Sequence, residues 1–349
     1  MAANRVLSES ELIVRRRSEA AQKLQGDSLP PSTIIRFPYI GEVDFGQFKD
    51  LTYLRELWFG MSVIERTDFE NRYGWIAQLA YVPMVSSILT AMLHFWDPSY
   101  NCFTFGAIDM CPIMEEYRQL INTEPGVKMY AHNKDNQGKR QLARFIGVST
   151  ANVTSWETQG SKDIEIASFI NFIRETPNPQ SKLAMMALLI YGEIMFPKSD
   201  GVIDERVVVL FNEINHRVDP IMPILAETLR SLTNCREGKS TKFNGCAQLL
   251  IIWALNHFKC SQTFKIPRLN YRPCYSTMRN YVTEFVGIRW PERGPPKKHW
   301  IRFLLGITEQ DVERLCPKSR NQSIIYACGD MAWVPLLEPW GDCLYTEYV

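Results

Sequence analysis

The chain has 349 residues, of which 46% are apolar and 22% charged, and its formal net charge is +1. These proportions are ordinary for a globular protein and exclude a largely disordered chain, while the near-zero charge excludes a partner attracted by overall electrostatics. Nine cysteines are too sparse for a disulfide scaffold, so we expect most of them to be small buried side chains in a reducing compartment.

The N-terminal segment and the apolar runs indicate an intracellular protein outside the membrane. Residues Met1–Glu9 lack the apolar stretch of a signal peptide. The runs at 183–196 and 249–255 are too short to span a bilayer, and Glu193 interrupts the first. We therefore expect both runs to be buried core helices.

The first third of the chain predicts an arm, two helices and one small β element. Residues 1–25 form a charged amphipathic pattern that Gly26, Pro30 and Pro31 break, so 1–29 is expected to be a helical arm ahead of a main domain at 30–349. Helical spacing of apolar residues follows at 48–57 and 82–95. Segments 102–105 and 107–110 read as two strands around a glycine turn, and Pro112 opens another helix.

A polar, glycine-containing loop at 122–140 is expected to be a boundary between two lobes. Beyond it the pattern predicts helices at about 141–147, 163–175, 181–195, 204–216, 220–234 and 243–258, and a short strand at 332–337. Asp219 is expected to cap the fifth of these helices, with Pro220 at its first position. The fold class expected is mainly α: a multi-helix globular domain with a small β-hairpin near 102–110, in one piece or in two lobes.

No segment carries a complete catalytic or cofactor motif. Gly238-Lys239-Ser240 lacks the earlier glycine and the preceding strand that a phosphate-binding loop needs. His257 and Cys260 form one pair with metal-ligand spacing, where zinc requires four ligands, and His257 is better explained as a histidine at a helix C-terminus. We therefore expect no cofactor and no metal.

Acid–base and nucleophilic chemistry are equally unsupported by local patterns. No Gly-x-Ser-x-Gly sequence occurs, and the five histidines lie in unrelated contexts. The pairs Glu115-Glu116 and Asp204-Glu205 stand at expected helix starts, where capping and the helix dipole explain them. The polar groups are thus expected to serve helix ends, connectors and surface. An enzyme whose site is assembled only in space stays an alternative.

One stretch, from Lys265 to Arg302, is locally basic and rich in aromatic residues. It holds nine basic side chains against Glu284 and Glu292, a local balance of +7, with tyrosine, phenylalanine and tryptophan between them. Phosphates attract such charge and bases stack on such rings, whereas the competing explanation is a core of aromatics covered by Arg and Lys stems. The candidate nucleic-acid-binding residues are Lys265, Arg268, Arg272, Arg279, Arg289, Arg293, Lys297, Lys298 and Arg302.

Three groups of segments carry a family likeness. They are His94–Gly106 with Asp109–Tyr117, Leu189–Pro197 with Gly201–Asp204, and Pro223–Leu232 with Cys235-Arg236 and Phe243–Leu250. In this order they resemble a plant-specific domain of unknown function found in retrotransposon-associated proteins, a relative of the plant mobile domain that is also labelled "aminotransferase-like". The likeness covers about residues 30–340.

The resemblance implies a transposon-derived plant protein, with nuclear location favoured over cytoplasmic, and it supplies no catalytic residues. The "aminotransferase-like" label has no support here, because a pyridoxal phosphate enzyme needs a Schiff-base lysine and a phosphate cup in an α/β fold.

We therefore expect a non-enzymatic binding or assembly module that acts near nucleic acid. The alternatives are a self-association module and the spatially assembled enzyme. The oligomeric state is left open.

Overall fold

The computed structural model describes residues 41–46, 49–99, 101–105, 108–123, 138–198, 201–258 and 295–312, together with the backbone of 333–338 and 341–346. The fold is mostly helical, as the sequence predicts. The expected arm at 1–29, most of the expected lobe boundary and the turn of the predicted hairpin lie outside these residues.

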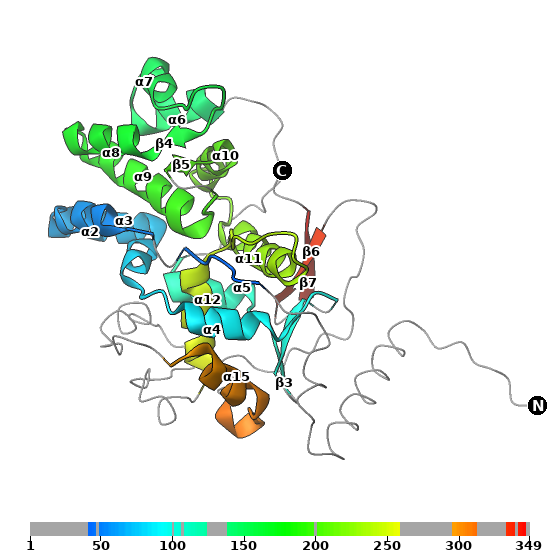
Figure 1. The fold of residues 1–349 in the computed structure, drawn as a ribbon. Helices are drawn as coiled ribbons and strands as arrows, with labels where there is room; N and C mark the ends of the chain where they lie inside the picture. Colours follow the sequence, from blue (N-terminus) through cyan, green and yellow to red (C-terminus); the bar gives the residue numbers. More distant parts are fainter. Residues whose placement is uncertain are drawn as a thin grey trace, which may run out of the picture.

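Helices build both ends of the molecule in Figure 1. One end holds α6 to α10, and the other holds α4, α5, α11, α12 and α15, with α2 and α3 projecting at the side. Their bounds are α2 Thr52–Phe59, α3 Val63–Tyr73, η2 Ile76–Tyr81, α4 Ser86–Leu93, α5 Met114–Ile121, α6 Gly138–Ile146, α7 Thr150–Ser155, α8 Ile166–Glu175, α9 Pro179–Ile190, the π-helical turn η3 Tyr191–Met195, α10 Glu205–Ile214, α11 Ile221–Arg236, α12 Ala247–His257, α15 Lys297–Leu305 and η4 Glu309–Asp311.

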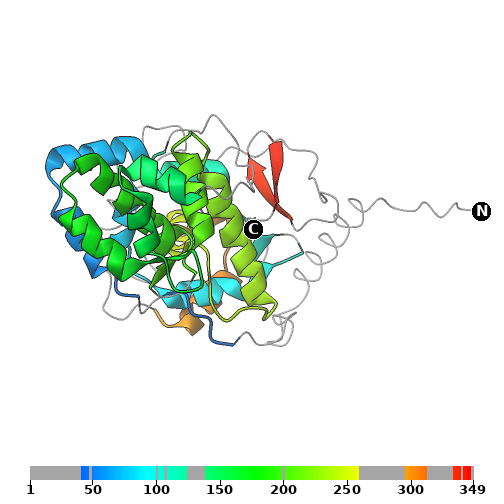
Figure 2. The same ribbon diagram turned by 90° about the horizontal axis from the view of Figure 1, so that it is seen from above.

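Short antiparallel sheets connect these helices. The predicted hairpin is confirmed as β2 (Cys102–Phe105) and β3 (Ile108–Met110), and β1 (Trp96–Asp97) adds a third strand beside β2. Strands β4 (Ile164–Glu165) and β5 (Val202–Ile203) pair before α8 and α10. The predicted strand near 332–337 is β6 (Trp333–Glu338), which pairs with β7 (Gly341–Thr346) and lies beside α11 (Figure 2).

The core is one contiguous cluster of apolar side chains that includes both helical ends. Every residue of 183–190 and of 247–255 is buried, which confirms that the two apolar runs form core helices. Each fully buried large aliphatic side chain contributes about 1.5–3 kcal/mol relative to exposure, so these runs contribute substantially to the stability of the fold. Trp96 and Phe103 from the small sheet extend the same core to Trp253 of α12.

Helix starts follow the local chemistry of the sequence. Ser62 and Glu65 form a reciprocal capping box at α3, and Asn178 accepts from the first turn of α9 ahead of Pro179. Asp204 accepts a hydrogen bond from Arg206 N at α10. Asp219 accepts one from Ile221 N (2.9 Å) at the start of α11, as expected of a capping side chain, although α11 begins at Ile221 and the N-cap position itself is Pro220.

Candidate functional sites

The candidate nucleic-acid residues divide into two groups. Lys265, Arg268, Arg272, Arg279, Arg289 and Arg293 lie outside the described residues, so no position is assigned to them. Lys297, Lys298 and Arg302 lie on α15, and we name them the α15 basic face.

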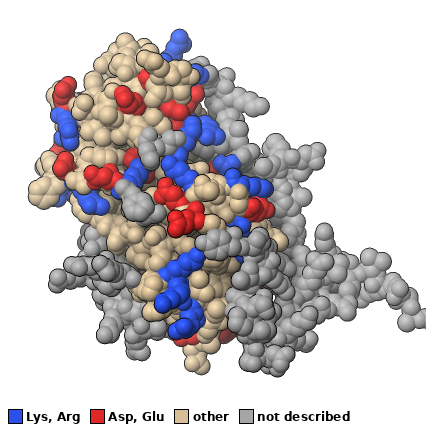
Figure 3. Space-filling view, viewed as in Figure 1, with Lys and Arg blue, Asp and Glu red and all other residues tan. Residues whose placement is uncertain are grey.

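The α15 basic face is positioned by the opposite, apolar side of the same helix. Trp300 and Leu304 are fully buried, and they fix α15 against the core. Lys298 and Arg302 are exposed one helical turn apart, and Lys297 is half-buried beside them. Figure 3 shows a stripe of basic side chains over the part of the surface where Figure 1 places α15.

Two further residues, His94 and Arg236, lie close to the α15 basic face. The pKa of His94 is lowered to about 4, mainly by burial and in addition by the nearby charges of Lys297 and Arg236. His94 follows the last residue of α4, and Arg236 is the last residue of α11. These shifts indicate a positive local potential where the ends of the three helices meet.

For Trp300 the structure decides between base stacking and core packing. Its ring is buried and lies edge-on to Phe303, with centroids 6.3 Å apart. A buried ring cannot stack on a base, so the described part of the basic stretch offers charge for phosphates and no stacking platform from this residue.

The glycine–lysine–serine segment is a connector between α11 and α12. Gly238 has φ +72°, and Lys239 N donates to Asn234 O at 2.8 Å, which closes the C-terminal end of α11. The helix in front of it, in place of a strand, agrees with the interpretation from sequence.

Glu116 is a buried carboxylate with more partners than a helix cap requires. Its Oε2 accepts from Ile113 N (3.0 Å) at the start of α5, the capping role predicted for it. The same oxygen accepts from Trp253 Nε1 (2.8 Å), and Oε1 lies 2.9 Å from His257 Nε2. We call Glu116, Trp253 and His257 the Glu116 cluster. It joins α5 to α12, so the purely local explanation of Glu116 is incomplete.

A second buried carboxylate, Glu193, lies in the π-helical turn η3. Glu193 is 4% exposed, and its two oxygens face Lys49 Nζ at 2.9 Å and the Tyr53 hydroxyl at 2.7 Å. Burial raises the pKa of Tyr53 far above its usual value, and the Glu193 charge raises it further, so Tyr53 stays a hydrogen-bond donor. We call Lys49, Tyr53 and Glu193 the Glu193 cluster.

The Glu193 cluster is suited to holding two segments together. It lies beside a cavity of about 340 Å³ whose wall includes Asp44, Asp50 and Ile166. Both carboxylate oxygens of Glu193 are already engaged, and neither Lys49 nor Tyr53 is free to act as a base. Although π-helical turns are frequent at functional sites, here the turn directs a carboxylate toward the segment that precedes α2.

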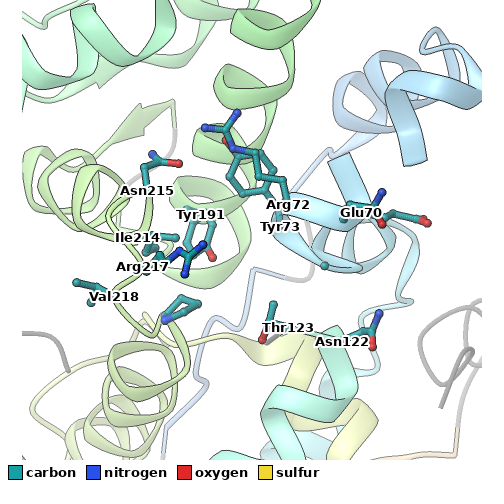
Figure 4. Close-up of a pocket in the computed structure, with 13 residues that line it drawn as sticks. Glu70, Arg72, Tyr73, Asn122, Thr123, Tyr191, Ile214, Asn215, Arg217 and Val218 are labelled. Atoms are coloured by element: carbon teal, nitrogen blue, oxygen red, sulfur yellow. The ribbon is translucent and has the colours of Figure 1, made fainter. Parts of the chain in front are cut away.

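A cavity of about 690 Å³ lies where several helices end, and we call it the junction pocket (Figure 4). Helices α3, α5 and α10 finish at its wall, and α11 starts there. The side chains that line it are mostly polar: Glu70, Asn71, Arg72, Tyr73, Asn122, Thr123, Tyr191, Asn215 and Arg217, with Ile214, Val218 and Pro220.

Left-handed backbone positions shape this pocket. Gly74, Asn122 and Arg217 have φ of +70°, +50° and +66°. Gly74 and Asn122 are the C-caps of α3 and α5, and Arg217 lies three residues after the end of α10. Only glycine fits at Gly74, because a Cβ there would lie 2.2 Å from Ile121 O. In Figure 4, Arg217 and Tyr191 stand across the pocket from Asn122 and Thr123.

An exposed apolar corner joins α2 to α3. Phe59, Val63 and Ile64 are 79%, 78% and 74% exposed, and we call them the α2–α3 corner. Clustered large apolar side chains on a surface are typical of an interaction site.

Comparison with known proteins gives a family and no function. A family model described as "Domain of unknown function (DUF7745)" matches residues 54–346. The chain belongs to this family. No curated protein matches it, and no solved structure matches it.

None of the helices described is both long and apolar enough to cross a membrane. The described residues contain no group of three or more side chains arranged to hold a metal ion.

Sequence reasoning missed the Glu193 cluster, the outer contacts of Glu116 and the junction pocket. Lys49 and Tyr53 are about 140 positions from Glu193, and no local spacing connects them. One signal was present: a carboxylate inside an otherwise apolar run requires a partner, because an unpaired buried charge is costly.

Proposed function

We propose that this chain is a non-enzymatic binding module of a transposon-derived plant protein, and that it contacts nucleic-acid phosphates through the α15 basic face. The resemblance to retrotransposon-associated proteins and to the plant mobile domain motivates the biological setting and a nuclear location. Membership of a family of unknown function is compatible with this proposal and adds no chemistry to it.

The single observation that carries the proposal is the orientation of α15. Lys298 and Arg302 are both exposed on one side, while Trp300 and Leu304 anchor the other side in the core. A rigid helix that holds two cations one turn apart contacts successive phosphates without side-chain stacking. The charge of Arg236, which with burial and Lys297 lowers the pKa of His94, extends the favourable region toward the end of α11.

Salt-dependent binding tests the proposal. Full-length protein is titrated into fluorescein-labelled single-stranded DNA, duplex DNA and RNA at several salt concentrations, with anisotropy as the signal. We expect affinity to fall steeply with salt, and the double variant Lys298→Gln, Arg302→Gln to lower the slope of log K against log[salt] by about 2 on duplex DNA.

The chain offers a matched control on α6. Arg140 and Arg144 are also exposed and also four residues apart. The double variant Arg140→Gln, Arg144→Gln removes the same charge from another surface and should leave the salt slope unchanged. The proposal is refuted by absence of binding at low salt, or by equal effects of the two double variants.

A second candidate function, self-association, is favoured by the α2–α3 corner. These three large apolar side chains would be removed from water if the corner packed against the same corner of a second copy of the chain. Sedimentation velocity at rising concentration should reveal a dimer or larger species that Phe59→Ser with Ile64→Thr abolishes. A strict monomer at high concentration would rule this function out.

A further inference from the structure

We propose that the junction pocket binds a small molecule through an oxyanion group, a carboxylate or a phosphate. This site is separate from the α15 basic face and does not depend on the proposed function. The cavity of about 690 Å³ falls within the size range of small-molecule sites, and its wall carries several hydrogen-bond donors from different helices.

Two arginines supply the positive charge of the pocket. Within the described residues neither Arg72 nor Arg217 has an ion-pair partner, although both side chains line the cavity. The Arg72 guanidinium lies over the rings of Phe145 (4.8 Å) and Tyr73 (5.4 Å), which hold its plane while leaving its N–H groups available. Planar guanidinium groups match the geometry of carboxylate and phosphate oxygens.

Arg217 is held at the pocket by an uncommon backbone conformation. Its φ of +66° places its backbone in the left-handed region, which few residues other than glycine and asparagine adopt. Hydrogen bonds from Arg217 N to Ile214 O (2.9 Å) and from Val218 N to Glu213 O (3.1 Å) fix this turn after α10. Arginine offers no advantage over glycine for such a turn, and the conformation places its side chain in the wall of the pocket.

Two buried hydroxyl groups lack a partner among the described residues. Tyr73 is 3% exposed, and neither its hydroxyl nor Thr123 Oγ1 makes a hydrogen bond there. A buried hydroxyl without a partner costs about 1–3 kcal/mol, so a bound acceptor would recover that energy. Burial raises the pKa of Tyr73 to about 12, which keeps the phenol protonated as a donor at neutral pH.

The competing explanation is that the arginines only compensate the negative ends of α3 and α10. Positive charge at a helix C-terminus is indeed stabilising. However, those ends already have backbone caps, since Gly74 N donates to Glu70 O and Val218 N to Glu213 O. Glu70 is the one carboxylate among the lining residues, and burial raises its pKa. Donors therefore outnumber charged acceptors, which favours an anionic ligand.

Isothermal titration of full-length protein with inorganic phosphate, pyrophosphate and citrate, each at constant ionic strength, tests the site. We expect saturable binding of at least one probe, at least ten-fold weaker in Arg217→Gln and in Arg72→Gln. Tyr73→Phe should weaken binding measurably while circular dichroism stays unchanged and the unfolding midpoint does not fall, because the lost hydroxyl has no partner among the described residues. The probe that binds best separates a phosphate ligand from a carboxylate ligand.

The variant Lys298→Gln, Arg302→Gln is the control that separates this site from the α15 basic face. It should bind the probes as the wild type does. Absence of saturable binding by the wild type overturns the proposal. So does unchanged affinity in Arg217→Gln, or loss of phosphate binding in the α15 variant alone, which would assign the phosphate to α15.

Discussion

Replacing Glu116 with alanine should destabilise the protein by about 2–6 kcal/mol. The substitution leaves the indole N–H of Trp253 and the imidazole of His257 without their acceptor, and both side chains are buried. Each buried polar group left unsatisfied costs about 1–3 kcal/mol, and the lower end applies if water enters the space. Loss of the bond to Ile113 N weakens the start of α5 in addition.

The conservative variant Glu116→Gln gives a sharper test. Its amide oxygen can accept from Trp253, and its amide nitrogen can donate to His257 Nε2 once the imidazole carries its proton on Nδ1. We therefore expect a loss of only about 1 kcal/mol, well below that of alanine.

Urea unfolding followed by far-ultraviolet circular dichroism measures both losses, with an unchanged m-value as a check on two-state behaviour. Asp68→Ala is the matched control, because Asp68 is an exposed carboxylate on α3 and should change stability by no more than about 0.5 kcal/mol. If Glu116→Ala costs less than 1 kcal/mol, or no more than glutamine, the Glu116 cluster does not contribute as a buried network.

Three further predictions concern single positions. Gly74→Ala should lower the free energy of unfolding by more than about 2 kcal/mol, because φ is +70° and the new Cβ would meet Ile121 O. Its control is Gly41→Ala, whose Cβ meets no atom within 4 Å and which should leave the thermal unfolding midpoint unchanged. The pKa of His94 is about 4 in the folded chain and 6.5 in the unfolded chain, so the unfolded state binds more protons between these pH values. The free energy of unfolding should therefore fall as the pH drops from 6.5 to 4, and His94→Asn should reduce that fall in urea titrations. Lys49→Met should lower the free energy of unfolding by about 3 kcal/mol, because it leaves the buried Glu193 charge without its ion-pair partner. Adding Glu193→Leu should restore stability, and a double variant less stable than Lys49→Met would contradict the pairing.

The parts of the fold that follow from local chemistry were predictable. The apolar runs of α9 and α12 are buried along their whole length, and the cap at Asp219 is where the sequence places it. Helix α3 was missed because only Phe69 and Tyr73 of its apolar residues are buried, while Val63 and Ile64 face outward. Its start was nevertheless readable in the capping box of Ser62 and Glu65.

The candidate sites were less predictable because they depend on distant residues. Strands β1, β4 and β5 are each two residues long, too short for an alternating pattern to appear. The junction pocket exists only because three helix ends meet, and no sequence spacing relates them. In the basic stretch, the exposure of Lys298 and Arg302 and the choice between core and stacking for Trp300 both required the packing of α15.

The segment in front of α2 has a practical consequence for protein production. Asp44 N donates to Thr241 O (2.8 Å), Phe243 N donates to Asp44 O (2.8 Å), and the ring of Phe45 packs on Phe243. The family match begins at residue 54, after the residues that make these contacts and after Lys49 and Tyr53. A fragment trimmed to the family boundary would uncover an aromatic ring and deprive Glu193 of both its partners. Expression of the family-defined fragment should therefore yield aggregation-prone material. The packed domain extends at least ten residues upstream of the family boundary, to Asp44.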